Sequence, residues 1–232
     1  MEVKFIVLIC IAAYLVGSVN FATVISRIKN KDIKKLGSGN PGTMNVMRSL
    51  GRGWGVLTFV LDALKGISFA LIGRFLIEGN ANYPMAILFG ACVVLGHIFP
   101  IFDRFRGGKG VASTIGVYMA ISPIAGCITL AALIIFLFVI KYGFLGSFLA
   151  VTTFAIHAII LCKSSVWAIV IIACWWALII FAHRNNIVRL IKGQENTLSL
   201  TKKNEVLIKQ EEEEKKTREE RENNLENNKE EE

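Results

Sequence analysis

Long apolar runs alternate with shorter polar segments along most of this chain. The runs cover about residues 5–25, 54–77, 84–102, 111–140, 144–162 and 166–182. Each is close to or longer than the roughly 20 residues that cross the hydrocarbon core of a bilayer as one helix. The pattern predicts an all-α, polytopic membrane protein.

The run at 111–140 is too long for one comfortable crossing. Ser122-Pro123 divides it, and proline disfavours the helical conformation in the residue before it. We therefore expect two helices, at 111–121 and 124–140, which brings the predicted number of membrane helices to seven.

The distribution of charge gives an orientation. If the N-terminus is outside, the predicted inner segments hold fourteen Lys and Arg residues, whereas the outer ones hold only Lys4 and Lys163. The inner segments are 26–53, 103–110, 141–143 and 183–193. The positive-inside rule then places the C-terminus in the cytoplasm. Without the division at Ser122-Pro123, the basic residues after it would face the opposite side.

Composition supports this class and divides the chain into two parts. Hydrophobic residues make up 53% of the 232 residues, and the mean hydropathy is +0.53. We expect a membrane domain at 1–201. The tail at 202–232 holds 12 Glu against 8 Lys and Arg, which is typical of a solvated segment, disordered or a single helix.

Several kinds of chemistry find no support in the sequence. The five cysteines form no Cys-x-x-Cys pair and lie in or at the end of apolar runs, so we expect no metal site. No cofactor motif and no nucleic-acid-binding module is present. We attribute part of the basic charge to attraction between the cytoplasmic side and anionic lipid headgroups.

The segment Arg106-Gly-Gly-Lys-Gly110 has the composition of an anion-binding loop. Its glycines could take φ > 0 and present successive N–H groups, beside the positive charges of Arg106 and Lys109. Such an arrangement favours phosphate. On local sequence alone, a basic turn that separates two membrane helices explains the residues equally well.

The first inner loop, residues 37–48, is also rich in hydrogen-bonding groups. Residues 37–42 fit G-x-G-x-x-G, but no strand precedes them, so a dinucleotide site is excluded. A tight turn remains, with Ser38, Asn40, Asn45 and Arg48 at one membrane surface; a simple connector is the alternative.

Some ionisable residues lie within or beside the predicted helices. Asp62 and Lys65 are one turn apart, and a structural ion pair is favoured over contact with substrate. His97 is either a general base or a hydrogen-bond donor to another polar group. His157 has no apparent partner and is interpreted as structural, and Arg74 is expected to extend towards the interface.

After the last apolar run, His183 and Asn186 share a helix face if the helix continues. A polar collar that ends the helix is the alternative. Three polar clusters from distant parts of the chain thus fall on one predicted membrane face. They indicate chemistry on a small anionic substrate, with an apolar partner that comes from the bilayer.

Together these motifs resemble one family, the PlsY-type bacterial glycerol-3-phosphate acyltransferases. The resemblance covers about residues 1–195. The residues that carry it are Gly37 to Asn45, Arg48, Asp62, Lys65-Gly66, Gly96-His97, Phe99-Pro100, Gly107 to Gly110, His183, Asn186, Lys192-Gly193 and Glu195.

The resemblance implies a multi-pass protein of the bacterial inner membrane with seven helices, an external N-terminus and an active site at the cytoplasmic face. It also implies the reaction, in which an acyl group moves from acyl phosphate to the 1-hydroxyl of sn-glycerol 3-phosphate, giving lysophosphatidic acid and phosphate. No cofactor is implied. Membrane lipids and the soluble enzyme that supplies acyl phosphate are the implied partners.

The family's functional positions carry over by motif. Those with implied catalytic roles are Ser38, Arg48, Lys109, His183 and Asn186. Those implied to bind substrate or shape its site are Asn40, Asn45, His97, Arg106, Gly107, Gly108, Gly110 and Ser147. Asp62, Lys65 and Glu195 are expected to be structural near the site.

The chain departs from the family pattern at three places. Arg106 replaces a lysine, Thr43-Met44 replaces Ala-Thr, and Phe144 replaces a serine. At Phe144, near Ser147, the chain therefore lacks a hydroxyl that the family pattern has.

The mechanism follows from groups that the sequence lacks. No histidine is followed by an aspartate in the His-x4-Asp spacing, since Asp103 comes one position too late after His97. We therefore expect direct attack by the glycerol hydroxyl without an acyl-enzyme. An organic-phosphate transporter, which would place polar groups near the midplane, and a lipid-binding scaffold are the alternatives.

Overall fold

The structure, a computed structural model, describes residues 2–76, 83–140 and 143–195. All regular structure in these ranges is helical, which confirms the expected all-α fold. The α-helices are α1 Val3–Gly17, α2 Phe21–Ile28, α3 Thr43–Leu50, α4 Arg52–Leu71, α5 Tyr83–Ile98, α6 Val111–Ile121, α7 Pro123–Ile140, α8 Gly143–Leu161, α9 Val166–Ala182 and α10 Arg184–Ile191. Short 3-10 turns lie at Ile33–Lys35 and Ile101–Asp103, and a π-helical turn at Ile72–Leu76 follows α4.

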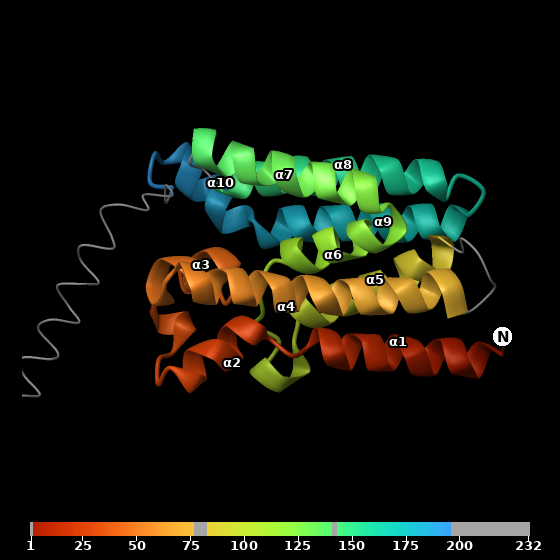
Figure 1. Cartoon of the computed structure of the whole chain (residues 1–232), viewed down its shortest axis with the longest axis horizontal. Helices are drawn as coiled ribbons and strands as arrows, with labels where there is room; N and C mark the ends of the chain where they lie inside the picture. Colours follow the sequence, from red (N-terminus) through yellow and green to blue (C-terminus); the bar gives the residue numbers. More distant parts are fainter. Residues whose placement is uncertain (1, 77–82, 141–142, 196–232) are drawn as a thin grey trace, which may run out of the picture. The chain divides into compact units, whose positions relative to one another are not determined.

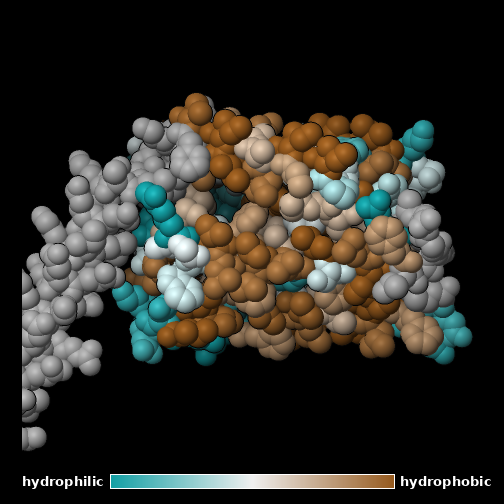
Figure 2. Space-filling model, viewed as in Figure 1, coloured by the Kyte–Doolittle hydropathy of each residue, from teal (hydrophilic) through white to brown (hydrophobic). Residues whose placement is uncertain are grey.

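The long helices run side by side, and the three helices of eight residues gather at one end (Figure 1). In Figure 1, α1, α4, α5, α7, α8 and α9 are nearly aligned, while α2, α3 and α10 lie at the end opposite the N-terminus. Apolar residues cover much of the visible flank, and hydrophilic residues gather towards the two ends (Figure 2). This distribution is typical of a helix bundle surrounded by lipid.

The division of the apolar run at 111–140 is confirmed. Helix α6 ends at Ile121 and α7 begins at Pro123. Between them Ser122 has φ −148° and ψ 86°, outside the helical region that proline disfavours in its preceding residue. The expected start of the second helix at 124 differs by one residue.

The first apolar run, predicted at 5–25, lies within one segment long enough to span a membrane, Val3–Ile28, but this segment contains a break that the sequence did not predict. Helix α1 ends at Gly17 and α2 starts at Phe21. Asn20 caps α2, since its Oδ1 accepts a hydrogen bond of 2.9 Å from the backbone N–H of Thr23. The hydropathy pattern continues through the break and therefore conceals it.

Four helical segments of the described chain are long and apolar enough to cross a membrane. They are Val3–Ile28, Arg52–Phe75, Tyr83–Asp103 and Gly143–Leu161. Helices α9 and α10 form a fifth if counted as one segment bent by 48°. Val111–Ile121 and Pro123–Leu137 are shorter apolar helices. Residues 77–82 between the second and third apolar runs, Lys141 and the tail at 202–232 lie outside the described residues.

Glycine allows the closest helix contacts. A Cβ atom added to Gly116 of α6 would lie 2.0 Å from the Ala63 carbonyl oxygen of α4, and one added to Gly66 would lie 2.2 Å from that of Ser113. On α5, Gly96 approaches the Tyr14 carbonyl of α1 equally closely, at 2.2 Å. Small residues bring backbones together in this way in membrane helices.

We expect the substitution Gly116→Val to destabilise the bundle. The added side chain must separate α4 from α6, and overpacking costs about 1–3 kcal/mol or more. Thermal unfolding of the detergent-purified protein should show a midpoint at least about 2–4 °C lower. Gly53→Ala is the control, because nothing lies within 4 Å of an added Cβ there. Equal midpoints for the two variants would contradict this account of the packing.

Candidate active site

Three ionisable residues form a buried group between α4 and α5. Lys65 Nζ lies 2.8 Å from Asp62 Oδ1 and 3.0 Å from His97 Nδ1. It also donates hydrogen bonds of 3.0 Å to the carbonyl oxygens of Gly17 and Val19. Asp62, Lys65 and His97 are each less than 5% exposed. The expected ion pair of Asp62 and Lys65 is therefore present. Lys65 also satisfies two backbone carbonyl oxygens that have no helical partner where α1 ends.

The glycine-rich loop rests directly on His97. Its N–H groups at Gly107 and Gly108 donate 3.1 Å hydrogen bonds to the carbonyls of Ile98 and His97. A Cβ added to Gly107 would lie 2.0 Å from the His97 carbonyl oxygen, and one added to Gly108 would lie 2.2 Å from Nε2 of the same residue. The space available, rather than backbone conformation, therefore requires glycine at these two positions.

The expectation that three glycines offer successive free amides is thus wrong for Gly107 and Gly108. Only Gly110 has a positive φ, of 81°. The amides that remain for an anion are those of residues 109–113, for which no backbone hydrogen bond is found in the described chain, whereas the Thr114 N–H donates to the Gly110 carbonyl at 2.9 Å. These amides lie at the N-terminal end of α6, and the N-terminal end of a helix favours anions.

Asn45 organises the first inner loop from within. Its Oδ1 accepts a 2.9 Å hydrogen bond from the Ser38 N–H, and its Nδ2 donates to the carbonyls of Ile33 and Leu36 at 3.1 and 2.9 Å. The side chain is 2% exposed. Gly37, with φ 55°, forms the turn. The side-chain amide of Asn45 thus stabilises its own loop. Ser38 takes part in these hydrogen bonds through its backbone N–H, and its hydroxyl does not take part.

The first loop touches the glycine-rich loop. Asn20 donates a 3.1 Å hydrogen bond to the Pro41 carbonyl, and the same carbonyl oxygen lies 3.0 Å from a Cβ added to Gly108. Asn40 is half-buried beside it, with Nδ2 2.9 Å from a Cβ added to Gly42. Two of the three predicted clusters therefore meet.

The third cluster joins them from α9 and α10. Asn186 Oδ1 accepts a hydrogen bond from Lys109 Nζ, and its Nδ2 donates to Glu195 Oε1 at 2.7 Å. His183, at the junction of the two helices, has its Nδ1 2.8 Å from the Ile179 carbonyl oxygen. A carbonyl only accepts, so Nδ1 carries the proton and a neutral ring keeps Nε2 as an acceptor.

Two further cations and one carboxylate lie close enough to Lys109 to act on its charge. We call Arg48, Lys109, Arg189 and Glu195 the cation cluster. Glu195 Oε2 pairs with Arg189 Nε at 3.1 Å. Burial lowers the pKa of Lys109 to about 8; the charges of Arg189 and Arg48 act in the same direction, whereas Glu195 opposes them. Burial also lowers the pKa of Arg48, with Glu195 again opposing.

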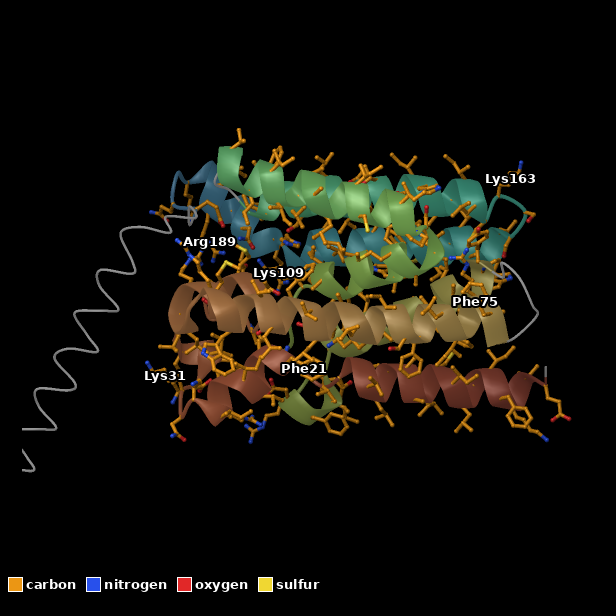
Figure 3. All side chains as sticks on the ribbon, viewed as in Figure 1. Phe21, Lys31, Phe75, Lys109, Lys163 and Arg189 are labelled. Carbon is orange, nitrogen blue, oxygen red and sulfur yellow. The ribbon has the colours of Figure 1, made fainter. Side chains whose placement is uncertain are left out.

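Arg189 was not among the predicted site residues. Its signal in the sequence is its position three residues after Asn186, which places both on one face of α10. Figure 3 shows Lys109 and Arg189 towards the end of the bundle that also bears Lys31, whereas Phe75 and Lys163 lie towards the opposite end.

An aromatic pair on α8 supports His183. The Phe148 ring meets the imidazole edge to face, with centroids 5.2 Å apart, and Phe144 packs on Phe148 at 5.6 Å. Ser147 donates instead to the Gly143 carbonyl of its own helix at 3.0 Å. No contact recorded among the described residues joins Ser147 to the cation cluster.

Other residues have roles away from the cluster. Arg106 is exposed, and no contact in the described chain links it to Lys109. His157, expected to lack a partner, has Nδ1 3.0 Å from the Tyr118 hydroxyl. Arg74 donates to the Ala120 carbonyl at the end of α6, so it caps that helix.

Within the described ranges, no group of His, Cys, Asp and Glu residues is arranged to hold a metal ion.

The site therefore joins all three polar clusters at one end of an apolar bundle. An excess of partly buried positive charge, amides at a helix start and a histidine acceptor suit a phosphorylated substrate. These features define an integral membrane protein that acts on a small organic phosphate.

Comparison with known proteins agrees with this class. A family model described as "Glycerol-3-phosphate acyltransferase" matches residues 7–193. A glycerol-3-phosphate acyltransferase of Thermoanaerobacter pseudethanolicus is 41% identical over 202 residues, which cover 86% of this chain and 98% of the relative. One from Burkholderia pseudomallei is 37% identical over 204 residues, covering 85% and 98%.

Two crystal structures of PlsY, described as an integral membrane glycerol 3-phosphate acyltransferase, share the fold. The glycerol 3-phosphate form has a TM-score of 0.74 and 38% identity, with 84% of this chain and 96% of that one covered. The lysophosphatidic acid form has a TM-score of 0.71 at 38% identity, covering 83% and 94%. The chain belongs to the glycerol-3-phosphate acyltransferase family, of the PlsY type, and is a multi-pass membrane protein.

We expect the affinity for glycerol 3-phosphate to fall above about pH 8. Lys109 is charged below its pKa of about 8 and loses the proton above it, so each further pH unit should weaken binding about tenfold. Calorimetric titration of the purified protein measures this. In Lys109→Arg, whose side chain stays charged, the decline should disappear. The same decline in both proteins would mean that another group causes it.

Proposed function

We propose that this protein transfers an acyl group from acyl phosphate to the 1-hydroxyl of sn-glycerol 3-phosphate, in phospholipid synthesis. The products are lysophosphatidic acid and inorganic phosphate. The observation that carries the proposal is the cation cluster, in which motifs from three parts of the chain meet around Lys109. Family membership and the forms in which PlsY was crystallised support the substrate and product.

The cations bind the phosphates. Lys109, Arg48 and Arg189 would neutralise the substrate phosphate and the phosphate of the donor. Asn186 and Glu195 hold Lys109 and Arg189 in place through the hydrogen bonds described above. The amides of Lys109 and Gly110 supply further donors at the start of α6. Arg106 takes no part in this group because it lies exposed outside it.

The neutral groups orient the reacting atoms. His183 Nε2 is available to accept a hydrogen bond from bound substrate, because Nδ1 donates to the Ile179 carbonyl. The hydroxyl of Ser38 lies free beside the loop that Asn40 and Asn45 shape. Gly107 and Gly108 allow the glycine-rich loop to rest on His97, whose contacts with Asp62 and Lys65 support it.

The reaction is a direct displacement. The glycerol oxygen forms a bond to the acyl carbonyl carbon, and the bond from that carbon to the phosphate oxygen breaks. The phosphate leaves with the electron pair and takes the hydroxyl proton. The protein contributes orientation and stabilisation of the developing negative charge.

The proposed topology has seven membrane crossings, an external N-terminus and a cytoplasmic C-terminus, in the bacterial inner membrane. Its support is the asymmetry of fourteen inner basic residues against Lys4 and Lys163. Helices α6 and α7 supply the two shorter crossings. The site then faces the cytoplasm, where glycerol 3-phosphate and a soluble supplier of acyl phosphate are accessible.

Turnover with acyl phosphate and glycerol 3-phosphate, followed by phosphate release, tests the function. Lys109→Ala should lose about 10²–10³ in kcat, the cost of removing one charge-stabilising group. Lys31→Ala is the matched control, since Lys31 is exposed at the same end of the bundle. Removal of 202–232 should leave the rate unchanged. A well-folded protein without turnover would favour a lipid-binding scaffold.

Direct displacement predicts that no acyl group becomes attached to the protein. Rapid quenching during turnover with radiolabelled acyl phosphate, followed by denaturation and mass spectrometry, should detect unmodified chain only. Acylation of Ser38 or any other residue at a rate that matches turnover would replace this mechanism by a two-step one.

A further inference from the structure

The segment between α5 and the glycine-rich loop exposes large apolar side chains. We call residues 99–106 the apolar loop. Phe102 is 65% exposed, Phe105 57% and Ile101 48%. In Figure 1 the loop emerges beside the junction of α1 and α2. A contiguous exposed apolar surface marks an interaction site, and the mechanism above does not use this one.

The backbone of the apolar loop satisfies most of its own donors. Its N–H bonds run from Phe99 to the Leu95 carbonyl at 2.8 Å, from Asp103 and Phe105 to that of Pro100 at 3.2 and 2.8 Å, and from Arg106 to that of Asp103 at 3.2 Å. The left-handed φ angles of Arg104 and Phe105, 54° and 57°, curl the chain back on itself. In water such closure is unnecessary, but at membrane depth an unpaired N–H is expensive.

The loop is continuous with a surface that faces lipid. Tyr14 of α1 donates a 2.8 Å hydrogen bond from its hydroxyl to the Phe99 carbonyl, and the Ile101 N–H lies 3.4 Å from Ser18 Oγ. Helix α1 belongs to a membrane-spanning segment, and Leu8, at 62% exposed, shows its outward apolar face. The apolar loop therefore extends this lipid-facing surface towards the site.

The acidic side chain of the loop is directed inward, and its two basic side chains are exposed. Asp103 turns inward, where its side chain is 14% exposed and pairs with Lys34 at 2.7 Å and with the Thr23 hydroxyl at 3.2 Å. Arg104 and Arg106 are exposed, and neither has a recorded partner among the described residues. Outward arginines beside outward aromatics are typical of a segment at the level of anionic headgroups.

We propose that the apolar loop inserts into the leaflet on the side of the glycine-rich loop. Phe102 and Phe105 enter the acyl region, and Arg104 and Arg106 bind the headgroups of anionic phospholipids. Because Gly107 follows at once, the loop ties the phosphate-binding segment to the lipid surface. This inference does not depend on the reaction proposed above.

Photo-crosslinking tests the insertion. p-Benzoylphenylalanine replaces Phe102 or Phe105 in protein reconstituted into nanodiscs of phosphatidylglycerol and phosphatidylcholine, with the exposed Lys31 as the control position. After illumination, mass spectrometry should find lipid adducts at 102 and 105 at least about tenfold above those at 31. Thermal unfolding verifies that each variant is folded. Folded variants whose adducts at 102 and 105 do not exceed those at 31 would overturn the proposal.

A second measurement leaves the phenylalanines intact. Native mass spectrometry of the double variant Arg104→Gln, Arg106→Gln should show about threefold less retained phosphatidylglycerol, with phosphatidylcholine unchanged. The matched control, Lys31→Gln with Lys35→Gln, removes two exposed charges from the neighbouring inner loop and should retain more phosphatidylglycerol than the arginine variant. Equal retention in the two double variants would refute the assignment of headgroups to Arg104 and Arg106.

Discussion

The buried ammonium of Lys65 is the constraint on which the other parts depend. A buried charge is tolerated only when partners surround it, and here the partners come from α1, α4 and α5. Lys65 donates hydrogen bonds to the carbonyl oxygens of Gly17 and Val19 at the end of α1. These bonds stabilise the break between α1 and α2, which leads into the first inner loop. His97 contacts Lys65 through its side chain. Its backbone carbonyl accepts a hydrogen bond from Gly108 of the glycine-rich loop.

From this base, hydrogen bonds extend outward to the reacting groups. The glycine-rich loop places Lys109 against Asn186, and Asn186 connects it to Glu195 and Arg189 on the last described segment. Lys109, Arg189 and Glu195 therefore each have a fixed neighbour before substrate arrives. Preorganisation of this kind is the main electrostatic means by which enzymes stabilise a transition state.

Local rules explain what the sequence could predict. Proline at 123 ends α6, and the spacing of Asp62 and Lys65 brings their side chains together; both effects act within one turn of helix. The end of α1 at Gly17 escaped prediction because Lys65, 48 positions away, occupies its carbonyls. The need for glycine at Gly108 likewise arises from His97, a contact that no local pattern records.

The charge balance of the cation cluster has a consequence for turnover. Three cations and one carboxylate give the cluster a net positive charge, which the two negative charges of a phosphate dianion neutralise. In the proposed reaction, the inorganic phosphate that leaves has the same recognition chemistry as the phosphate that entered. Charge alone then gives the site no means to prefer substrate over product, so accumulated phosphate competes for it. The rate in the cell would depend on how fast phosphate is carried away.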